Sequence, residues 1–262
     1  MPARRLESAN RFYTRQQRLI AMAIAQARRS WSTKRYAGLL ALLFLLQREN
    51  SQNSLDYMPD LLEELGIDAP ATASPNPQTL VGWSSAGAPL QNYVEAAPSL
   101  PMLQQLVATE IYDIGRITQQ MDMVARPTIA GSIRYLNPPS CGRCTILAGR
   151  FYPYSGDFAR HENCDCFMVP VDREIKASDL LTDPEAAFEA GEVKGLSKAD
   201  MEAIRDGADM ASVINVRSRR AGLRVSGRVL ERGGRITPEG IYAVTRNRDD
   251  AIEMLTNAGY MR

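Results

Sequence analysis

The sequence predicts a mainly α-helical protein with a small α+β region, in which short β-strands surround a knuckle-like cluster of cysteines and a histidine. Two observations lead to this fold class. Long stretches rich in helix-forming residues, several with recognisable caps, occupy most of the chain. All four cysteines and the only histidine fall between positions 141 and 166, with a candidate strand on each side of the cluster.

The N-terminal region, residues 1–68, is predicted to consist of three helices. Residues 4–30 contain neither proline nor glycine, which favours one long helix. A second helix is expected over the apolar stretch 36–48, and a third over 55–65, where Gly66 stands at the usual C-terminal capping position.

A proline-rich segment, residues 69–101, follows. Prolines at 70, 75, 77, 89, 98 and 101 exclude a continuous regular element, so we expect a linker or an extended arm. Helical spacing of apolar residues resumes over 103–123 and opens the third region, residues 102–262.

Short strands are expected on both sides of the cysteine cluster. β-Branched residues are frequent over 128–136, and the stretch 166–171 has similar character. Two short helices are predicted after the cluster, over 184–190 and 197–206. Ser197 with Asp200 resembles a capping box at the start of the second.

The C-terminal part is predicted to contain a mobile basic loop and two more helices. Residues 217–235 are rich in arginine and interrupted by glycines, which indicates a loop. Thr237 before Pro238 fits a helix start. Asn247 fits the cap of a last helix, residues 247–258, which Gly259 ends.

Composition narrows the function classes only a little. The net charge of +1 gives no overall bias toward nucleic acid or membrane. The longest apolar run, residues 36–46, is too short to span a bilayer, so no membrane partner is expected, and the N-terminus lacks the pattern of a secretory signal. We therefore expect a cytosolic environment, in which thiols stay reduced and a cysteine cluster more often binds metal than forms disulfides.

Local charge is more informative, because arginines gather near both ends of the chain. These arginines are candidates for contact with nucleic acid or with an acidic partner, and the alternative is an ordinary solvated face. The candidates are Arg4, Arg5, Arg11, Arg15, Arg18, Arg217, Arg219, Arg220, Arg224 and Arg228.

The cysteine and histidine cluster has the form C-x2-C-x16-H-x2-C-x-C and consists of Cys141, Cys144, His161, Cys164 and Cys166. Zinc takes four soft or borderline ligands at tetrahedral corners, and a C-x2-C turn brings two thiolates to one ion. We predict structural Zn²⁺ bound by Cys141, Cys144, His161 and one of Cys164 or Cys166, with the spare thiol beside the site or as an alternate ligand.

Other chemistries for this cluster remain open. Cys141 and Cys144 are spaced like a redox pair, although no thioredoxin-like strand and helix are predicted around them. Reduced cysteines that only pack are a second alternative. Catalytic zinc needs an open position and a base, for which Glu162 and Asp165 are available. A serine or cysteine triad would need His161, which is already the best nitrogen ligand, so no catalytic residue is predicted.

The region around the cluster resembles the head morphogenesis family named after protein F of phage Mu. The resemblance extends over residues 103–262 and includes the stretches 195–215 and 237–260, which are similar to members from actinobacteriophages; the N-terminal third matches only in its helical character. The residues that carry it at the cluster are Pro138, Pro139, Ser140, Cys141, Cys144, Leu147, Ala148, Gly149, Arg150, Arg160, His161, Cys164, Asp165 and Cys166.

The resemblance implies a minor capsid protein of a tailed bacteriophage, placed inside the head near the portal and made in the host cytoplasm. Its partners would be the portal, scaffold and major capsid proteins, with non-specific contact to packaged DNA. Similar proteins are often labelled capsid maturation proteases, so proteolysis of the capsid or scaffold protein is an alternative. A zinc-ribbon module that binds DNA is a further one.

Overall fold

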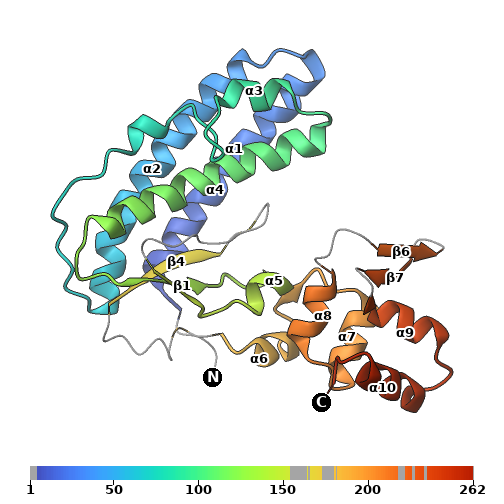
Figure 1. Ribbon diagram of the computed structural model, residues 1–262. Coiled ribbons are helices and arrows are strands. Elements are labelled where there is room, and N and C mark those ends of the chain that lie inside the picture. Colours follow the sequence, from blue (N-terminus) through green and yellow to red (C-terminus); the bar gives the residue numbers. More distant parts are fainter. Residues whose placement is uncertain are drawn as a thin grey trace. The chain divides into compact units, whose positions relative to one another are not determined.

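The computed structural model describes residues 5–153, 164, 166–172, 180, 182–217, 222–225, 228–232 and 235–261. The chain forms two compact units. The long-helix unit comprises residues 3–137 and 149–181, and the short-helix unit comprises residues 138–148 and 182–262. Helix predominates in both, as the sequence predicted for a mainly α protein with a small β region, and each unit contains a small three-stranded sheet (Figure 1).

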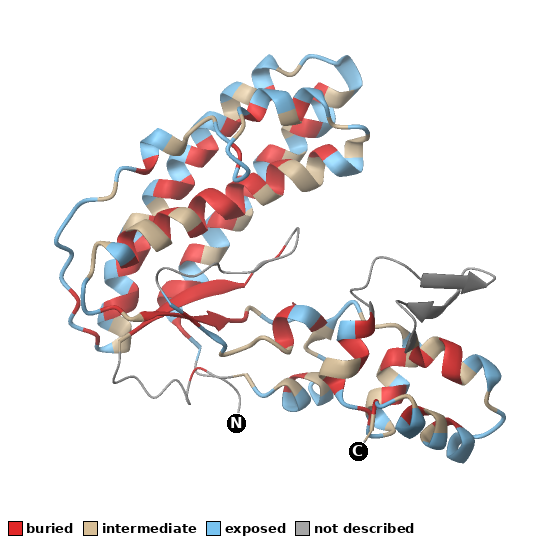
Figure 2. Cartoon of the chain, viewed as in Figure 1, coloured by how far each residue is buried: buried red, intermediate tan, exposed pale blue. Residues whose placement is uncertain are grey.

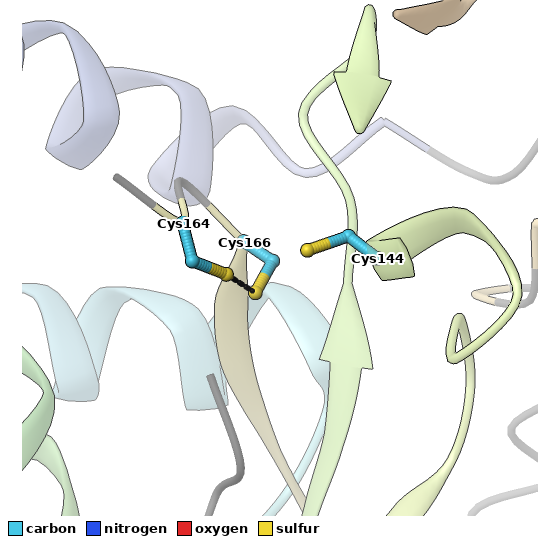
Figure 3. Close-up of side chains that lie close together, drawn as sticks. All are labelled: Cys144, Cys164 and Cys166. Carbon is cyan, nitrogen blue, oxygen red and sulfur yellow. Dashed lines mark hydrogen bonds between the residues drawn. The ribbon is translucent and has the colours of Figure 1, made fainter. Parts of the chain in front are cut away.

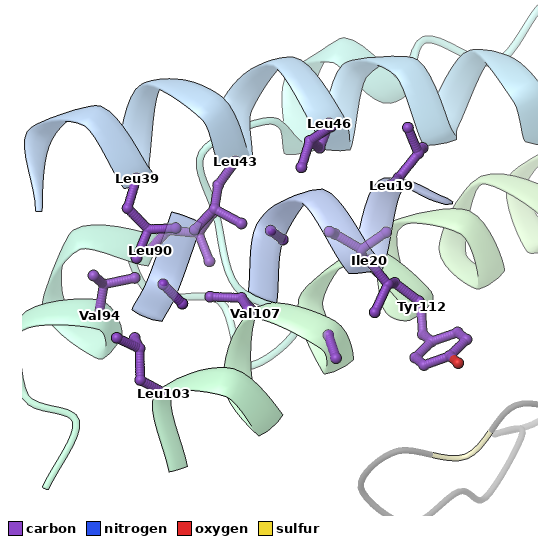
Figure 4. Packing of buried hydrophobic residues seen from close by; sticks show 14 residues of the cluster. Leu19, Ile20, Leu39, Leu43, Leu46, Leu90, Val94, Leu103, Val107 and Tyr112 are labelled. Atoms are coloured by element: carbon purple, nitrogen blue, oxygen red, sulfur yellow. The ribbon is translucent and has the colours of Figure 1, made fainter. Parts of the chain in front are cut away.

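Three long helices, α1 (Glu7–Thr33), α2 (Ala37–Leu65) and α4 (Leu100–Val124), pack against one another in the long-helix unit. Their buried residues lie on the sides that face each other (Figure 2). Figure 4 shows leucines and valines from all three helices meeting in one apolar cluster, to which the short helix α3 (Leu90–Glu95) adds Leu90 and Val94. Helix α1 and helix α4 confirm the helices predicted for 4–30 and 103–123.

Helix α2 corrects the prediction of two separate helices over 36–48 and 55–65. The polar run between them is helical because it faces α4 and not solvent: Asn50, Ser51 and Ser54 are buried. The amide of Asn50 donates to the carbonyl of Ile111 at 2.7 Å, and the Ser54 hydroxyl donates to the carbonyl of Asn50 at 2.9 Å. Gly66 ends α2 with a positive φ of 71°, as predicted.

The segment 69–101 has no continuous regular element, as its prolines predicted. It contains a 3-10 turn, η1 (Pro77–Leu80), and helix α3. Leu90 and Val94 of α3 are fully buried in the apolar cluster, and the Gln47 side chain receives the backbone N–H of Gly82 at 2.8 Å. Part of this segment is therefore packed on the helices.

A three-stranded antiparallel sheet with the order β3-β1-β4 completes the long-helix unit. Its strands are β1 (Gly131–Tyr135), β3 (Phe151–Pro153) and β4 (Phe167–Val171). Strands β1 and β4 confirm the two predicted strands and are buried along their whole length. Ile133, Tyr135 and Phe167 pack against Phe12 of α1 and Tyr57 of α2, so this side of the sheet is closed by the helices.

The short-helix unit contains helices α5 (Gly142–Thr145), α6 (Pro184–Glu189), α7 (Lys198–Arg205), α8 (Met210–Arg217), α9 (Pro238–Val244) and α10 (Arg248–Asn257), together with the parallel pair β2 (Ser140–Cys141) and β5 (Val193–Lys194). Ser197, Thr237 and Asn247 cap α7, α9 and α10 as predicted, and Ser197 with Asp200 forms a complete capping box.

The predicted mobile loop over 217–235 is wrong. Among its described residues, 222–225, 228–232 and 235–236 form strands β6 (Gly222–Val225), β7 (Arg228–Arg232) and β8 (Arg235–Ile236) in an antiparallel sheet. The many arginines led to the loop prediction, although the sequence also carries a strand pattern. Aliphatic residues alternate with the arginines, and the pairs Ser-Gly and Gly-Gly separate the three strands in the sequence.

No helix among the described residues has the length and apolar character that crossing a membrane requires.

Candidate metal centre

Cys164 and Cys166 lie directly before strand β4 and are almost fully buried, at 1% and 2% exposure. The antiparallel register pairs Tyr135 of β1 with Phe167 of β4 and Arg134 with Met168. Because side chains alternate across a strand, Arg134 points to the face opposite Ile133 and Tyr135. The start of β4 thus places two sulfurs beside the guanidinium of β1.

Cys144 lies on the short helix α5, in a loop that leaves β1 and returns to it. Gly149 donates its N–H to the carbonyl of Arg134 at 2.9 Å, and Arg134 donates its N–H to the carbonyl of Arg150 at 3.2 Å. The Sγ of Cys141 caps α5 by accepting the N–H of Cys144 at 3.3 Å. This is the tight turn expected of a C-x2-C knuckle.

The sulfurs of Cys144, Cys164 and Cys166 all lie within 4.8 Å of one another, and all three residues are buried (Figure 3). The Sγ atoms of Cys164 and Cys166 are 2.8 Å apart and joined by a hydrogen bond. Tetrahedral zinc with bonds of about 2.3 Å holds its sulfurs about 3.8 Å apart, so an ion would require this pair to separate by about 1 Å. The three thiols otherwise fit a soft divalent ion, which would need one further ligand.

The sequence predicted five candidate ligands, and the structure gathers three of them. It brings together both Cys164 and Cys166, where the sequence favoured only one of the two. Cys141 is not a member of the group of three sulfurs, is only partly buried, and caps α5 instead. His161 lies outside the described residues.

Arg134 is the residue at this site that the sequence did not single out. It is 1% exposed, and its NH1 nitrogen donates to the Sγ of Cys166 at 2.6 Å. Its Nε and NH2 nitrogens donate to the hydroxyl of Tyr152 on β3 at 3.2 and 3.0 Å. Burial alone would lower the pKa of Arg134, but the neighbouring Cys166 and Tyr152 outweigh burial and raise that pKa, so the guanidinium stays charged.

A second arginine, Arg116 of α4, holds the backbone of the cysteine turn. Its NH2 nitrogen donates to the carbonyl of Cys164, and also to that of Cys166 at 3.4 Å. Its NH1 nitrogen pairs with the carboxylate of Asp113, one helical turn earlier, at 3.2 Å, and both side chains are at most 10% exposed. The ion pair with Asp113 therefore restrains Arg116, and Arg116 in turn restrains the backbone of Cys164 and Cys166.

The sequence held a weak signal for Arg134. Arg134 lies in the stretch Ser-Ile-Arg-Tyr-Leu, where polar and apolar residues alternate before the final leucine. In a strand with one solvated face, this alternation would place the arginine on the face toward solvent. No sequence feature showed that this strand is covered on both sides.

The arginines predicted to contact a partner fall in three groups. Arg5, Arg11, Arg15 and Arg18 are exposed at or near the start of α1, where Arg11 also pairs with Asp60 at 3.1 Å. Arg217, Arg224 and Arg228 lie on α8, β6 and β7, and their side chains are outside the described part. Arg4, Arg219 and Arg220 lie outside the described residues altogether.

A pocket of about 500 Å³ between α3 and α4 contains none of these candidates. It is lined mostly by apolar side chains, among them Tyr93, Met102 and Leu106, and by polar ones that include Glu110. The carboxylate of Glu110 accepts the N–H of Ser85 at 2.8 Å, so it supports the neighbouring loop.

Comparison of the chain with protein-family models, with curated proteins and with solved structures gives no match.

Proposed function

We propose that this chain is a structural head protein of a tailed bacteriophage and that a zinc ion held by Cys144, Cys164 and Cys166 stabilises its fold. The observation that carries the metal site is the convergence of three buried sulfurs within 4.8 Å. The resemblance of residues 103–262 to the Mu protein F family supports the role in the head.

Zinc is the ion that this donor set favours. Thiolates are soft ligands and select zinc over magnesium or calcium, which prefer oxygen. The fourth ligand in this proposal is His161 or Cys141, the two remaining members of the sequence motif. Four protein ligands leave no open coordination position, which supports a structural centre and not a catalytic one.

The proposed partners are the portal, scaffold and major capsid proteins. The exposed Arg15 and Arg18 of α1 supply positive charge for an acidic protein surface or for packaged DNA, whose phosphates are bound without regard to sequence. The proposed location is the interior of the head near the portal, after synthesis in the host cytoplasm.

Metal content is the first test. The purified protein should carry a single zinc ion per chain by elemental analysis, and Cys144→Ser and Cys166→Ser should each lose it. Thr118→Ser is the matched control, because Thr118 is fully buried in the long-helix unit and its hydroxyl donates within α4 at 2.7 Å. A wild-type protein without bound metal, after expression in zinc-containing medium, would contradict the proposed centre.

The role in the head has a separate test. Co-expression with the portal, scaffold and major capsid proteins of the same phage should give complete heads that contain this chain, and omission of the chain should give defective ones. Discrete truncated capsid or scaffold products would favour the capsid maturation protease instead. Tight, salt-sensitive DNA binding with normal heads in its absence would favour the DNA-binding module.

A further inference from the structure

Arg134 lies at the proposed metal site, and the role inferred for it rests on that proposal. Two sulfurs and a guanidinium lie together in the interior of the long-helix unit: Cys164 and Cys166 are at most 2% exposed, and Arg134 is 1% exposed. The guanidinium reaches both sulfurs, with NH1 at 2.6 Å from Cys166 Sγ and 3.7 Å from Cys164 Sγ.

A metal–thiolate complex at this place would carry excess negative charge. Three thiolates on a divalent ion leave a net charge of −1 if the fourth ligand is neutral, and −2 if it is another thiolate. Burying an uncompensated charge is costly, and a cation in hydrogen-bond contact offsets that cost. Arginine is suited to this role because it remains charged at every relevant pH and is less strongly hydrated than lysine.

The guanidinium is also held in a fixed orientation. Two of its nitrogens donate to the Tyr152 hydroxyl, and the guanidinium lies 5.3 Å from the Tyr152 ring. The NH1 nitrogen points toward the sulfurs of Cys164 and Cys166. Arg116 meanwhile holds the carbonyls of Cys164 and Cys166 from the side of α4, so the backbone that carries these sulfurs is restrained as well.

We infer that Arg134 is a positioning residue of the metal site, which balances the charge of the bound metal–thiolate complex and orients the Cys166 sulfur through a direct hydrogen bond. Partners that orient metal ligands in this way usually contribute 10- to 100-fold to affinity. A hydrogen bond also draws electron density from a thiolate, so the bound sulfur should react more slowly with electrophiles.

The test compares Arg134→Met and Arg134→Lys with the wild type in the full chain. Zinc affinity is measured by competition with a chromophoric chelator, and the ligand field by the absorption of Co²⁺ in place of zinc. We expect Arg134→Met to bind zinc roughly 10- to 100-fold more weakly. Arg134→Lys should recover part of the loss because it keeps the charge, and both variants should shift the sulfur-to-cobalt absorption.

Arg126→Met is the matched control. Arg126 is a largely buried arginine of the long-helix unit, at 11% side-chain exposure, which pairs with Asp122 at 2.6 Å and donates to the carbonyl of Ala69. It makes no described contact with a cysteine, so this variant should lose stability and keep the zinc affinity of the wild type. The reaction of zinc-loaded protein with iodoacetamide should accelerate in Arg134→Met and not in Arg126→Met.

Each outcome decides one of the two proposals. If the wild type binds zinc and Arg134→Met binds it equally well with an unchanged cobalt spectrum, Arg134 has no such role while the metal site stands. If the wild type binds no zinc, the metal site fails and the inference fails with it. Should Arg134→Met not fold, Tyr152→Phe replaces it: loss of the hydroxyl must then weaken zinc binding by a smaller factor, and unchanged affinity refutes the inference.

Discussion

Two regions of the long-helix unit are stabilised by different kinds of interaction. One is the apolar cluster between α1, α2 and α4, and the other is the cysteine turn before β4. In the apolar cluster, leucines and valines from several helices are fully buried against one another. At the turn, buried arginines donate to sulfurs and carbonyls. Apolar burial stabilises without any further component, whereas under the proposed metal site the buried thiols would gain their full stability only with a bound ion. On that proposal, the apolar cluster is stable by itself and the cysteine turn depends on the metal.

The largest expected effect is loss of the metal. Structural zinc contributes on the order of 10 kcal/mol to the folding of small metal domains, so chelation or Cys166→Ser should lower the melting temperature sharply. Hydrogen exchange should accelerate most in β1 and β4, while α1, α2 and α4 keep their protection. Equal acceleration in the helices would show that the two regions do not differ as described.

Next in size is a cavity in the apolar cluster. Leu43→Ala removes a fully buried side chain of α2 and should cost about 2–5 kcal/mol of the free energy of unfolding, measured by urea denaturation. Zinc content should stay unchanged. Leu45→Ala, in the same helix but 62% exposed, is the control and should change stability by less than about 0.5 kcal/mol.

A smaller effect is expected from overpacking between α2 and α4. A Cβ at Gly115 would lie 2.8 Å from Asn50 Nδ2 and 3.0 Å from Gln16 Nε2, so Gly115→Ala should destabilise by about 1–3 kcal/mol. Gly38→Ala serves as the comparison: its Cβ would meet Gln26 at an ordinary 3.5 Å, so replacing a helical glycine there should be neutral or stabilising. Thermal melts of the two variants in opposite directions would support this account, and equal losses would contradict it.

The smallest predicted effect lies in the short-helix unit. Ser197→Ala removes the hydroxyl that accepts the N–H of Asp200 at 3.1 Å and should cost about 1 kcal/mol. Ser32→Ala, at an exposed serine that caps no helix, should cost less. Denaturation midpoints of the pair measure the difference. A loss of zinc in Ser197→Ala would be unexpected, because the cap touches no cysteine.

The sequence was sufficient where local chemistry decides the structure. The N-terminal caps at Ser197, Thr237 and Asn247, and the end of α2 at Gly66, follow from side chains that satisfy free backbone groups nearby in the chain. Helices α1 and α4 follow in the same way from long stretches without a helix breaker. These features need no knowledge of distant residues.

The sequence was insufficient where residues far apart in the chain determine the local structure. The polar run 50–54 looked like a break between helices because its partner, the carbonyl of Ile111, is 61 positions away from Asn50. Arg134 was not singled out because Cys166, its partner, is 32 positions away. The cluster spacing predicted a metal site, but the choice among the sulfurs depended on how β4 begins and on the cap that Cys141 gives to α5.

The close approach of Gly115 to Asn50 also constrains how this protein can evolve. The glycine leaves the space that the amide fills, and the amide donates to the carbonyl of Ile111. A side chain at position 115 costs less once the one at position 50 has become smaller, so the two changes have a preferred order of inheritance. Among descendants of this chain, a glycine at 115 should be favoured where a large amide stands at 50, and lineages that lost the amide should lose the glycine more readily.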